Sequence, residues 1–199
     1  MADPFDESPN WPRQGDKLFG MTGDRNLQAY IAGGTEFYAH VEGYKRAGDT
    51  LIVQLRQEPR LLGTHYLVFP VVFLYRHFIE LSIKDVVAHG AYLETRRSEF
   101  PPHHDLVGLW VEARKVFDRV GGCTPEDLDA VGSLIAELNA IDPGSFSFRY
   151  PVKKDWSPSL AQTEFNLEQF CQGIAKLAEF FEAARAMLEH YKDVSDSMY

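Results

Sequence analysis

Within the most hydrophobic stretch of the chain, residues 66–89, four polar side chains share one face of the predicted helix. They are Arg76, His77, Glu80 and Lys84. At about 100° per residue these positions fall within one helical sector roughly 100° wide. Basic side chains and a histidine on one face could hold a phosphate group and transfer a proton. The first candidate for a ligand site is therefore this polar stripe on a single helix.

The same spacing also has a structural interpretation. Glu80 stands four residues after Arg76 and four before Lys84, the spacing at which opposite charges pair on a helix. A helix that is apolar on nearly all sides is central, and buried charges need partners. A buried ladder of ion pairs that fixes the register between helices is the alternative to a ligand site. Glu80 favours this alternative, because it neutralises positive charge that would attract an anion.

A histidine pair could add to the stripe. His103, His104 and Asp105 follow two prolines and open an apolar helical pattern. His104 could face the stripe, and two histidines with an acid could also bind a metal. Adjacent side chains rarely converge on one ion without further ligands, so we expect no metal site. Capping of the helix by His104 or Asp105 is the structural alternative.

The segment 145–151, SFSFRYP, supplies two more candidates, Arg149 and Tyr150. Its alternating aromatic residues, after a proline–glycine turn, predict a short extended segment. Arg149 could pair with Glu80 or contact a ligand phosphate. Alternatively, the segment is a structural strap whose phenylalanines fill the core.

The remaining pattern predicts the helices that position these residues. Apolar periodicity and capping signals predict helices from Thr35 to Arg56, from about 66 to Gly90, from 104 to Val120, from Thr124 to 141, and from 164 onward. The fold class is therefore all-α, a single-domain bundle of about five helices. We expect a loose arm over 1–24, the bundle over 25–194 and a tail over 195–199. A short helical piece is expected within 26–32.

Composition narrows the function classes. The chain has 199 residues, 45% of them hydrophobic, and a formal net charge of −9, which argues against non-specific binding to a polyanion. Two cysteines without a metal pattern suggest a reducing compartment. There is no glycine-rich nucleotide loop, signal-peptide pattern or apolar run long enough to span a bilayer. We expect a soluble cytoplasmic protein with no cofactor and no membrane partner.

Three segments together resemble a known family. YRHFIELSIKDVV (75–87), HDLVGLW (104–110) and ELNAIDPGSFSFRYP (137–151), followed by an amphipathic helix, are similar to bacterial proteins of the HEPN superfamily. The resemblance covers roughly residues 35–190 and is most specific in RHFIEL and FRYP. That superfamily comprises small helical bundles. It includes metal-independent ribonucleases of toxin–antitoxin and phage-defence systems, and also non-catalytic members.

The resemblance implies a catalytic pair. Nuclease members usually dimerise and carry an arginine, four to six residues and then a histidine on a late helix. Arg185 and His190 fit this spacing. An arginine can stabilise the phosphorane and a histidine can move a proton during attack by a 2′-hydroxyl. In that case Arg76, His77 and Arg149 would position the phosphate, and no metal would be needed.

One position departs from the nuclease pattern. The residue after the arginine is often polar in the nucleases and is Ala186 here. The alternative to a ribonuclease or an RNA- or nucleotide-binding protein is a non-catalytic module that binds a partner protein. The wide apolar stripe of the last helix, with Phe170, Ile174 and Leu177 among its members, exceeds what one neighbouring helix needs, so part of it could pack across a homodimer. The alternative is that the whole stripe packs inside the core of one chain.

Overall fold

The computed structural model describes residues 11–19, 23–31, 37–57, 61–161 and 164–198. The chain divides into two compact units, Met1–Thr35 and Glu36–Tyr199. In the first unit a single 3₁₀ turn, η1 (Arg25–Leu27), is capped by Asp24, whose carboxylate accepts a hydrogen bond from the Asn26 amide at 2.9 Å. Every residue described there is exposed. The expected helical piece within 26–32 is thus one turn only.

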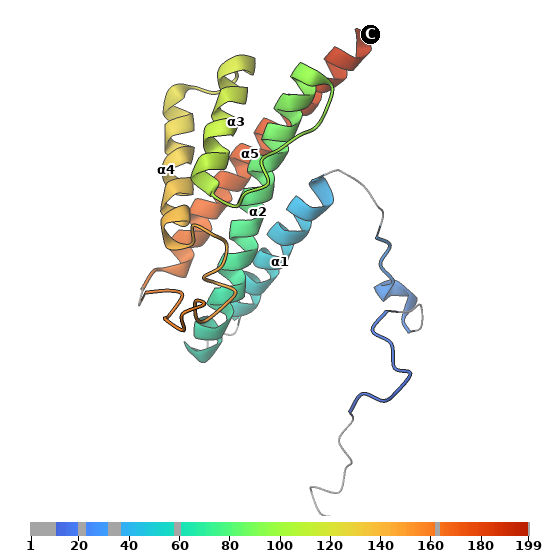
Figure 1. The fold of residues 1–199 in the computed structure, drawn as a ribbon, viewed down its shortest axis with the longest axis vertical. Helices are drawn as coiled ribbons and strands as arrows, with labels where there is room; N and C mark the ends of the chain where they lie inside the picture. The colour runs from blue at the N-terminus through green and yellow to red at the C-terminus, as the bar shows by residue number, and fades with distance from the viewer. Residues whose placement is uncertain (1–10, 20–22, 32–36, 58–60, 162–163, 199) are drawn as a thin grey trace, which may run out of the picture. The chain divides into compact units, whose positions relative to one another are not determined.

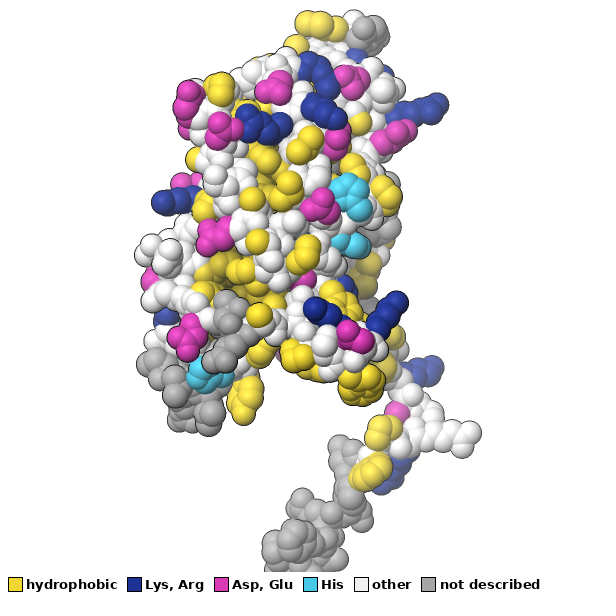
Figure 2. Space-filling view, turned by 60° about the vertical axis from the view of Figure 1, so that its left-hand side comes forward, with side chains coloured by type: hydrophobic (Ala, Val, Ile, Leu, Met, Phe, Trp, Pro, Cys, Tyr) yellow, Lys and Arg dark blue, Asp and Glu magenta, His cyan; other side chains and the backbone are white. Residues whose placement is uncertain are grey.

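The second unit is an all-helical bundle, as predicted. Its helices are α1 (Tyr38–Gln57), α2 (Leu61–Thr95), α3 (Leu106–Val120), α4 (Pro125–Ile141) and α5 (Leu167–Ser197). The long α2 packs against α1, α3 and α5, while α4 packs mainly against α3 (Figure 1). The described residues contain no strand, only an isolated bridge between Val152 and Pro158. Acidic and basic side chains are interspersed with hydrophobic ones over the face drawn in Figure 2.

Two predicted helix starts are confirmed in detail. Asp105 caps α3, and its carboxylate accepts a hydrogen bond from the Gly108 amide at 3.1 Å. Thr124 and Asp127 form a capping box at the start of α4, with Pro125 in the first turn. The expected cap at Thr35 lies outside the described residues.

Two helices end later in the chain than the sequence predicts. Gly90 does not end α2, which continues to Thr95. A β-carbon at position 90 would collide with the Val116 side chain of α3, so this glycine permits close packing of the two helices. At the other end of the chain α5 continues to Ser197, into the segment expected as a tail.

The central helix is apolar enough to raise the question of a membrane. Residues Gly63–Thr95 are the one described helix long and apolar enough to cross a bilayer, by length and composition alone, and 50% of its apolar window is buried inside the bundle. A core helix of a soluble protein gives the same pattern. Buried members of the core such as Val71, Ile79 and Ile83 come from this helix.

Candidate functional site

Arg76, Glu80 and Lys84 of the polar stripe on α2 form a cluster of ion pairs sealed inside the bundle, and the exposed His104 joins it at its edge. The Glu80 carboxylate accepts hydrogen bonds from Nη1 of Arg76 at 3.1 Å and from Nζ of Lys84 at 2.8 Å. Nδ1 of His104 lies 2.8 Å from Oε1 of Glu80, and it must be the donor because an ionised carboxylate only accepts. The side chains of Arg76 and Glu80 are 0% and 1% exposed. A ligand in solvent therefore has no access to the Arg76–Glu80 pair.

Arg76 also ties together segments that are distant in the sequence. Its Nε donates to the backbone carbonyl of Asp142, after α4, at 2.9 Å, and its Nη2 donates to the carbonyl of His104, before α3, at 2.8 Å. The Asp142 carboxylate lies 3.5 Å from Nε and accepts hydrogen bonds from the amides of Phe146 and Ser147. All of the donor atoms of the guanidinium are thus engaged by protein groups.

The pKa values follow from this arrangement. Burial alone would raise the pKa of Glu80, but the hydrogen bonds and charges of Lys84 and His104 outweigh it and hold the pKa below its usual range. Burial lowers the pKa of Arg76, against the attraction of Asp142 and Glu80. A guanidinium stays charged even so. Arg76 and Glu80 hold opposite charges side by side out of solvent, which suits a structural role better than a changing one.

His77 does not join this cluster. Its ring lies edge-on to Tyr44 at 4.3 Å between centroids and is stacked with Phe73 at 5.9 Å. Burial lowers its pKa, so the ring is neutral at neutral pH. It packs as an aromatic side chain between α1 and α2.

Arg149 and Tyr150 lie on a turn, not on the extended segment that the aromatic alternation predicted. The amides of both residues donate to the Phe146 carbonyl, at 3.0 and 3.2 Å. Nε of Arg149 donates to the Ser145 carbonyl at 2.6 Å, and its guanidinium carbon lies 5.7 Å from the ring centroids of both Phe73 and Tyr150. No pairing of Arg149 with a carboxylate occurs among the described residues. Asp142 causes the turn, because its carboxylate binds two amides there.

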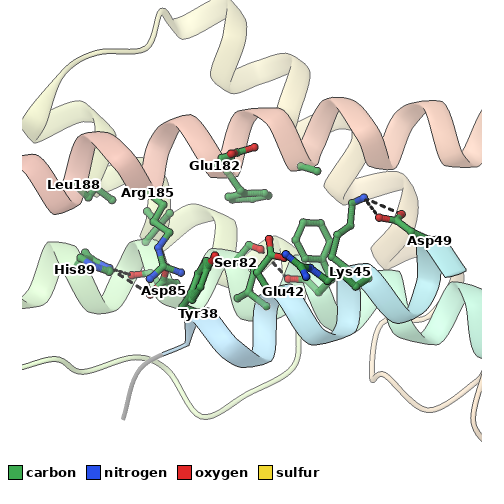
Figure 3. Close-up of a pocket in the computed structure, with 16 residues that line it drawn as sticks. Tyr38, Glu42, Lys45, Asp49, Ser82, Asp85, His89, Glu182, Arg185 and Leu188 are labelled. Atoms are coloured by element: carbon green, nitrogen blue, oxygen red, sulfur yellow. Dashed lines mark hydrogen bonds and ion pairs between the residues drawn. The ribbon is translucent and has the colours of Figure 1, made fainter. Parts of the chain in front are cut away.

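Arg185 points inward, into a pocket between α1, α2 and α5 with a volume of about 340 Å³. Figure 3 shows its side chain reaching from α5 toward Asp85 on α2 and Tyr38 on α1. Its Nη1 lies 3.6 Å from Oδ2 of Asp85, and its Nε donates to Glu189 at 2.7 Å. The guanidinium carbon is 4.5 Å from the centre of the Tyr38 ring. The protein's own groups thus surround this arginine.

The histidine beside Arg185 is His89 and not His190. Nδ1 of His89 lies 2.9 Å from the backbone carbonyl of Asp85 and 3.3 Å from its carboxylate. The hydrogen bond to Asp85 raises the pKa of His89 despite its burial. His190 is exposed and does not line the pocket. Arg185 and His190 are five residues apart, and five residues turn an α-helix through about 500°. The two side chains therefore leave α5 in directions that differ by about 140°.

The pocket does not have the charge of a phosphate site. Three lysine and arginine side chains, one histidine and four carboxylates line it. Most are paired within the chain: Lys45 with Asp49 at 2.7 Å, Arg46 with Glu42 at 2.6 Å, and Arg185 with Asp85 and Glu189. A phosphate group would therefore have to compete with carboxylates that already pair with these basic side chains.

The apolar stripe of α5 is mostly used inside the bundle. Ile174, Leu177, Phe181 and Leu188 are buried. Beyond them Tyr191, Val194 and Met198 are 38%, 39% and 74% exposed. Only this last part of the stripe remains open to a second chain.

Comparison with known proteins gives no family. No protein-family model matches the chain, and no match was found among the curated proteins or the solved structures. Functional inference therefore rests on the residues and on their geometry.

Sequence reasoning missed Asp85 and His89, although their spacing is the same kind of signal that identified the polar stripe. Asp85 and His89 are four residues apart on α2, as Arg76 and Glu80 are. Their relation to Arg185 depends on how α5 packs against α2, which no local pattern reports. Among the described residues, no group of three or more histidines, cysteines and carboxylates is placed to hold a metal ion.

Proposed function

We propose that the chain is a non-catalytic, HEPN-like helical module that binds a partner protein in a bacterial defence or stress system. The observation that supports this most is the separation of Arg185 from His190. Arg185 is turned into the bundle toward Asp85 and Tyr38, whereas His190 is exposed outside that pocket. General acid–base chemistry on one phosphate requires both groups within hydrogen-bond reach of it, which this arrangement does not offer.

The sealed cluster supports the same proposal. With Arg76 and Glu80 buried and mutually paired, the stripe that could have held a phosphate serves instead to join α2 to the segments around α3 and α4. The free cysteines Cys123 and Cys171 agree with action in the cytoplasm. A homodimer, implied by the resemblance, would use the exposed end of the α5 stripe.

The proposal is tested with purified protein and a mixed RNA pool in EDTA. Wild type, Arg185→Ala, His190→Ala and a control, Arg114→Ala, are compared after their folds are confirmed by circular dichroism. We expect no cleavage above background by any of the four proteins. Cleavage by wild type that both Arg185→Ala and His190→Ala abolish, and that Arg114→Ala retains, would establish the ribonuclease instead.

A second candidate function, RNA or nucleotide binding without cleavage, is supported by Arg149. Its guanidinium lies over two aromatic rings and has no carboxylate partner among the described residues, an arrangement on which a base and its phosphate could rest. Anisotropy of a labelled single-stranded RNA, with Arg149→Ala and Tyr150→Ala as variants, tests it. Binding by wild type that both variants weaken would favour this candidate over the first.

A further inference from the structure

The segment that follows α4 carries an exposed tryptophan with an unusual backbone conformation. Trp156 is 82% exposed and has a φ angle of 64°. This left-handed conformation is rare for a bulky side chain and strains the backbone. A large apolar side chain held in solvent at such a cost suggests a role outside the chain's own core.

Backbone hydrogen bonds hold the turn that carries Trp156. The Trp156 amide donates to the Lys153 carbonyl at 3.0 Å, and the Lys153 amide donates to the Ser157 carbonyl at 2.8 Å. The amide of Ser157 donates to the carboxylate of Asp155 at 3.0 Å. The bridge between Val152 and Pro158 closes the same turn from outside. The position of the Trp156 backbone is therefore defined by its neighbours.

The turn is also fastened to the bundle. Oγ of Ser159 donates to the Ser147 carbonyl at 3.2 Å, and the Ser159 amide donates to the Pro151 carbonyl at 3.0 Å. Phe148 is buried in the core at 8% exposure, and Leu160 packs against that core. A fastened turn loses little conformational entropy when a partner binds it.

The segment that carries Trp156 has a net charge opposite in sign to that of the whole chain. Lys153 and Lys154 are exposed on the same turn, and Arg149 is exposed just before it. Residues 145–161 carry a net charge of +2, although the whole chain carries −9. An acidic partner surface would thus be attracted to this turn and repelled by the protein elsewhere.

We propose that the Trp156 turn, residues 152–158, is the docking surface of the module and that its partner is a protein segment combining apolar side chains with carboxylates. This inference rests on the proposed binding function and names its surface and partner class. Tryptophan is enriched among the residues that dominate binding energy. Trp156 would enter an apolar pocket of the partner while Lys153 and Lys154 pair with carboxylates at its rim.

A protein fits this surface better than RNA. A single strand of RNA extends over several nucleotides and gains affinity from each neutralised phosphate. The positive charge here is confined to one short segment of a chain with strong negative charge. A compact acidic segment can contact the turn alone.

The test uses a random 12-residue peptide library displayed on phage and the full-length protein as bait. We expect selected peptides to be enriched in Asp and Glu together with large apolar residues. Their synthetic forms should bind wild type and lose affinity by about tenfold or more with Trp156→Gly. Glycine accepts the positive φ without strain, so this variant removes the side chain and keeps the turn.

Controls separate the side chain from general effects. Trp11→Ala removes another exposed tryptophan, 71% exposed, and should leave peptide binding unchanged. Lys154→Glu should weaken binding by several fold, whereas Lys176→Glu, on the exposed side of α5, should leave it unchanged. Both lysine variants change the net charge equally.

Each other outcome overturns the inference. Peptides that bind Trp156→Gly as well as wild type would place the docking surface elsewhere and leave the proposed binding function standing. A selection that enriches no peptide against wild type would reject this partner class. Binding of a single-stranded RNA that Trp156→Gly abolishes would replace the protein partner by RNA, and with it the function proposed above.

Discussion

Glu80→Gln tests whether the buried cluster on α2 is structural. The substitution keeps the shape of the side chain and removes the charge that Arg76, Lys84 and His104 share. Leaving buried charges without their partner costs about 3–5 kcal/mol. In a chain of this size each kcal/mol lowers Tm by about 2–4 °C, so a decrease of roughly 6–20 °C is expected.

The assay is urea unfolding followed by circular dichroism at 222 nm, with Glu168→Gln as the matched control. Glu168 pairs with Arg56 at 2.8 Å, but the two side chains are 57% and 54% exposed, and such surface pairs contribute little to stability because solvent screens them. If Glu80→Gln and Glu168→Gln lower the free energy of unfolding equally, the buried cluster does not hold the helices together.

Acid adds a second test of the same carboxylate. Because the folded protein holds the pKa of Glu80 below its ordinary value of 4.5, its contribution to stability is complete above that value. It disappears as the pH falls through the lowered pKa. The difference in unfolding free energy between wild type and Glu80→Gln should therefore be constant at neutral pH and shrink in acid. A difference that grows on acidification would contradict the assignment.

Two histidines and two glycines give further predictions. The pKa of His77 is lowered in the folded protein, so as the pH falls the unfolded chain binds a proton at this histidine before the folded chain does. The free energy of unfolding should therefore decrease below pH 6.5, and His77→Phe should reduce that decrease. The pKa of His89 is raised in the folded protein, so its contribution to stability is complete below pH 6.5 and is lost as the pH rises through the raised pKa. His89→Asn should remove this loss of stability, which is measured by urea unfolding across pH 5–8. Gly90→Ala should destabilise by about 1–3 kcal/mol through overpacking against α3. Gly43→Ala, with open space around its β-carbon, should stabilise by up to about 1 kcal/mol, and equal Tm values for these two variants would refute the packing argument.

Local sequence signals predicted much of the fold. The capping box at Thr124 and the cap at Asp105 depend on side chains within three residues, so the pattern determines them. The i,i+4 spacing of Arg76, Glu80 and Lys84 likewise predicted that they could pair, because a helix alone places them together. Gly90 was predicted to end α2 because glycine commonly follows the last turn of a helix. That prediction is wrong because Gly90 packs against Val116 of α3, a contact that no local pattern reports.

The sites were harder to predict than the helices. Asp142 looked like part of a turn, yet its carbonyl and carboxylate complete the surroundings of Arg76. Arg185 and His190 have a suggestive spacing, but packing of α5 against α1 and α2 decides what Arg185 contacts. Trp156 was not among the candidates, since neither its backbone angle nor its exposure follows from its neighbours in the sequence.

The contacts of Arg76 have a consequence for how the protein could be rebuilt. The chain enters the α3–α4 hairpin at His104 and leaves it at Asp142, and the backbone carbonyls of both residues bind the same guanidinium. Entry and exit points that lie this close are typical of sites where whole segments can be inserted or exchanged. One side chain of α2 thus closes the base of the hairpin, while the buried face of α3 packs into the core that α2 and α5 share. A substitute hairpin would need two carbonyls at its ends and an apolar face toward α2.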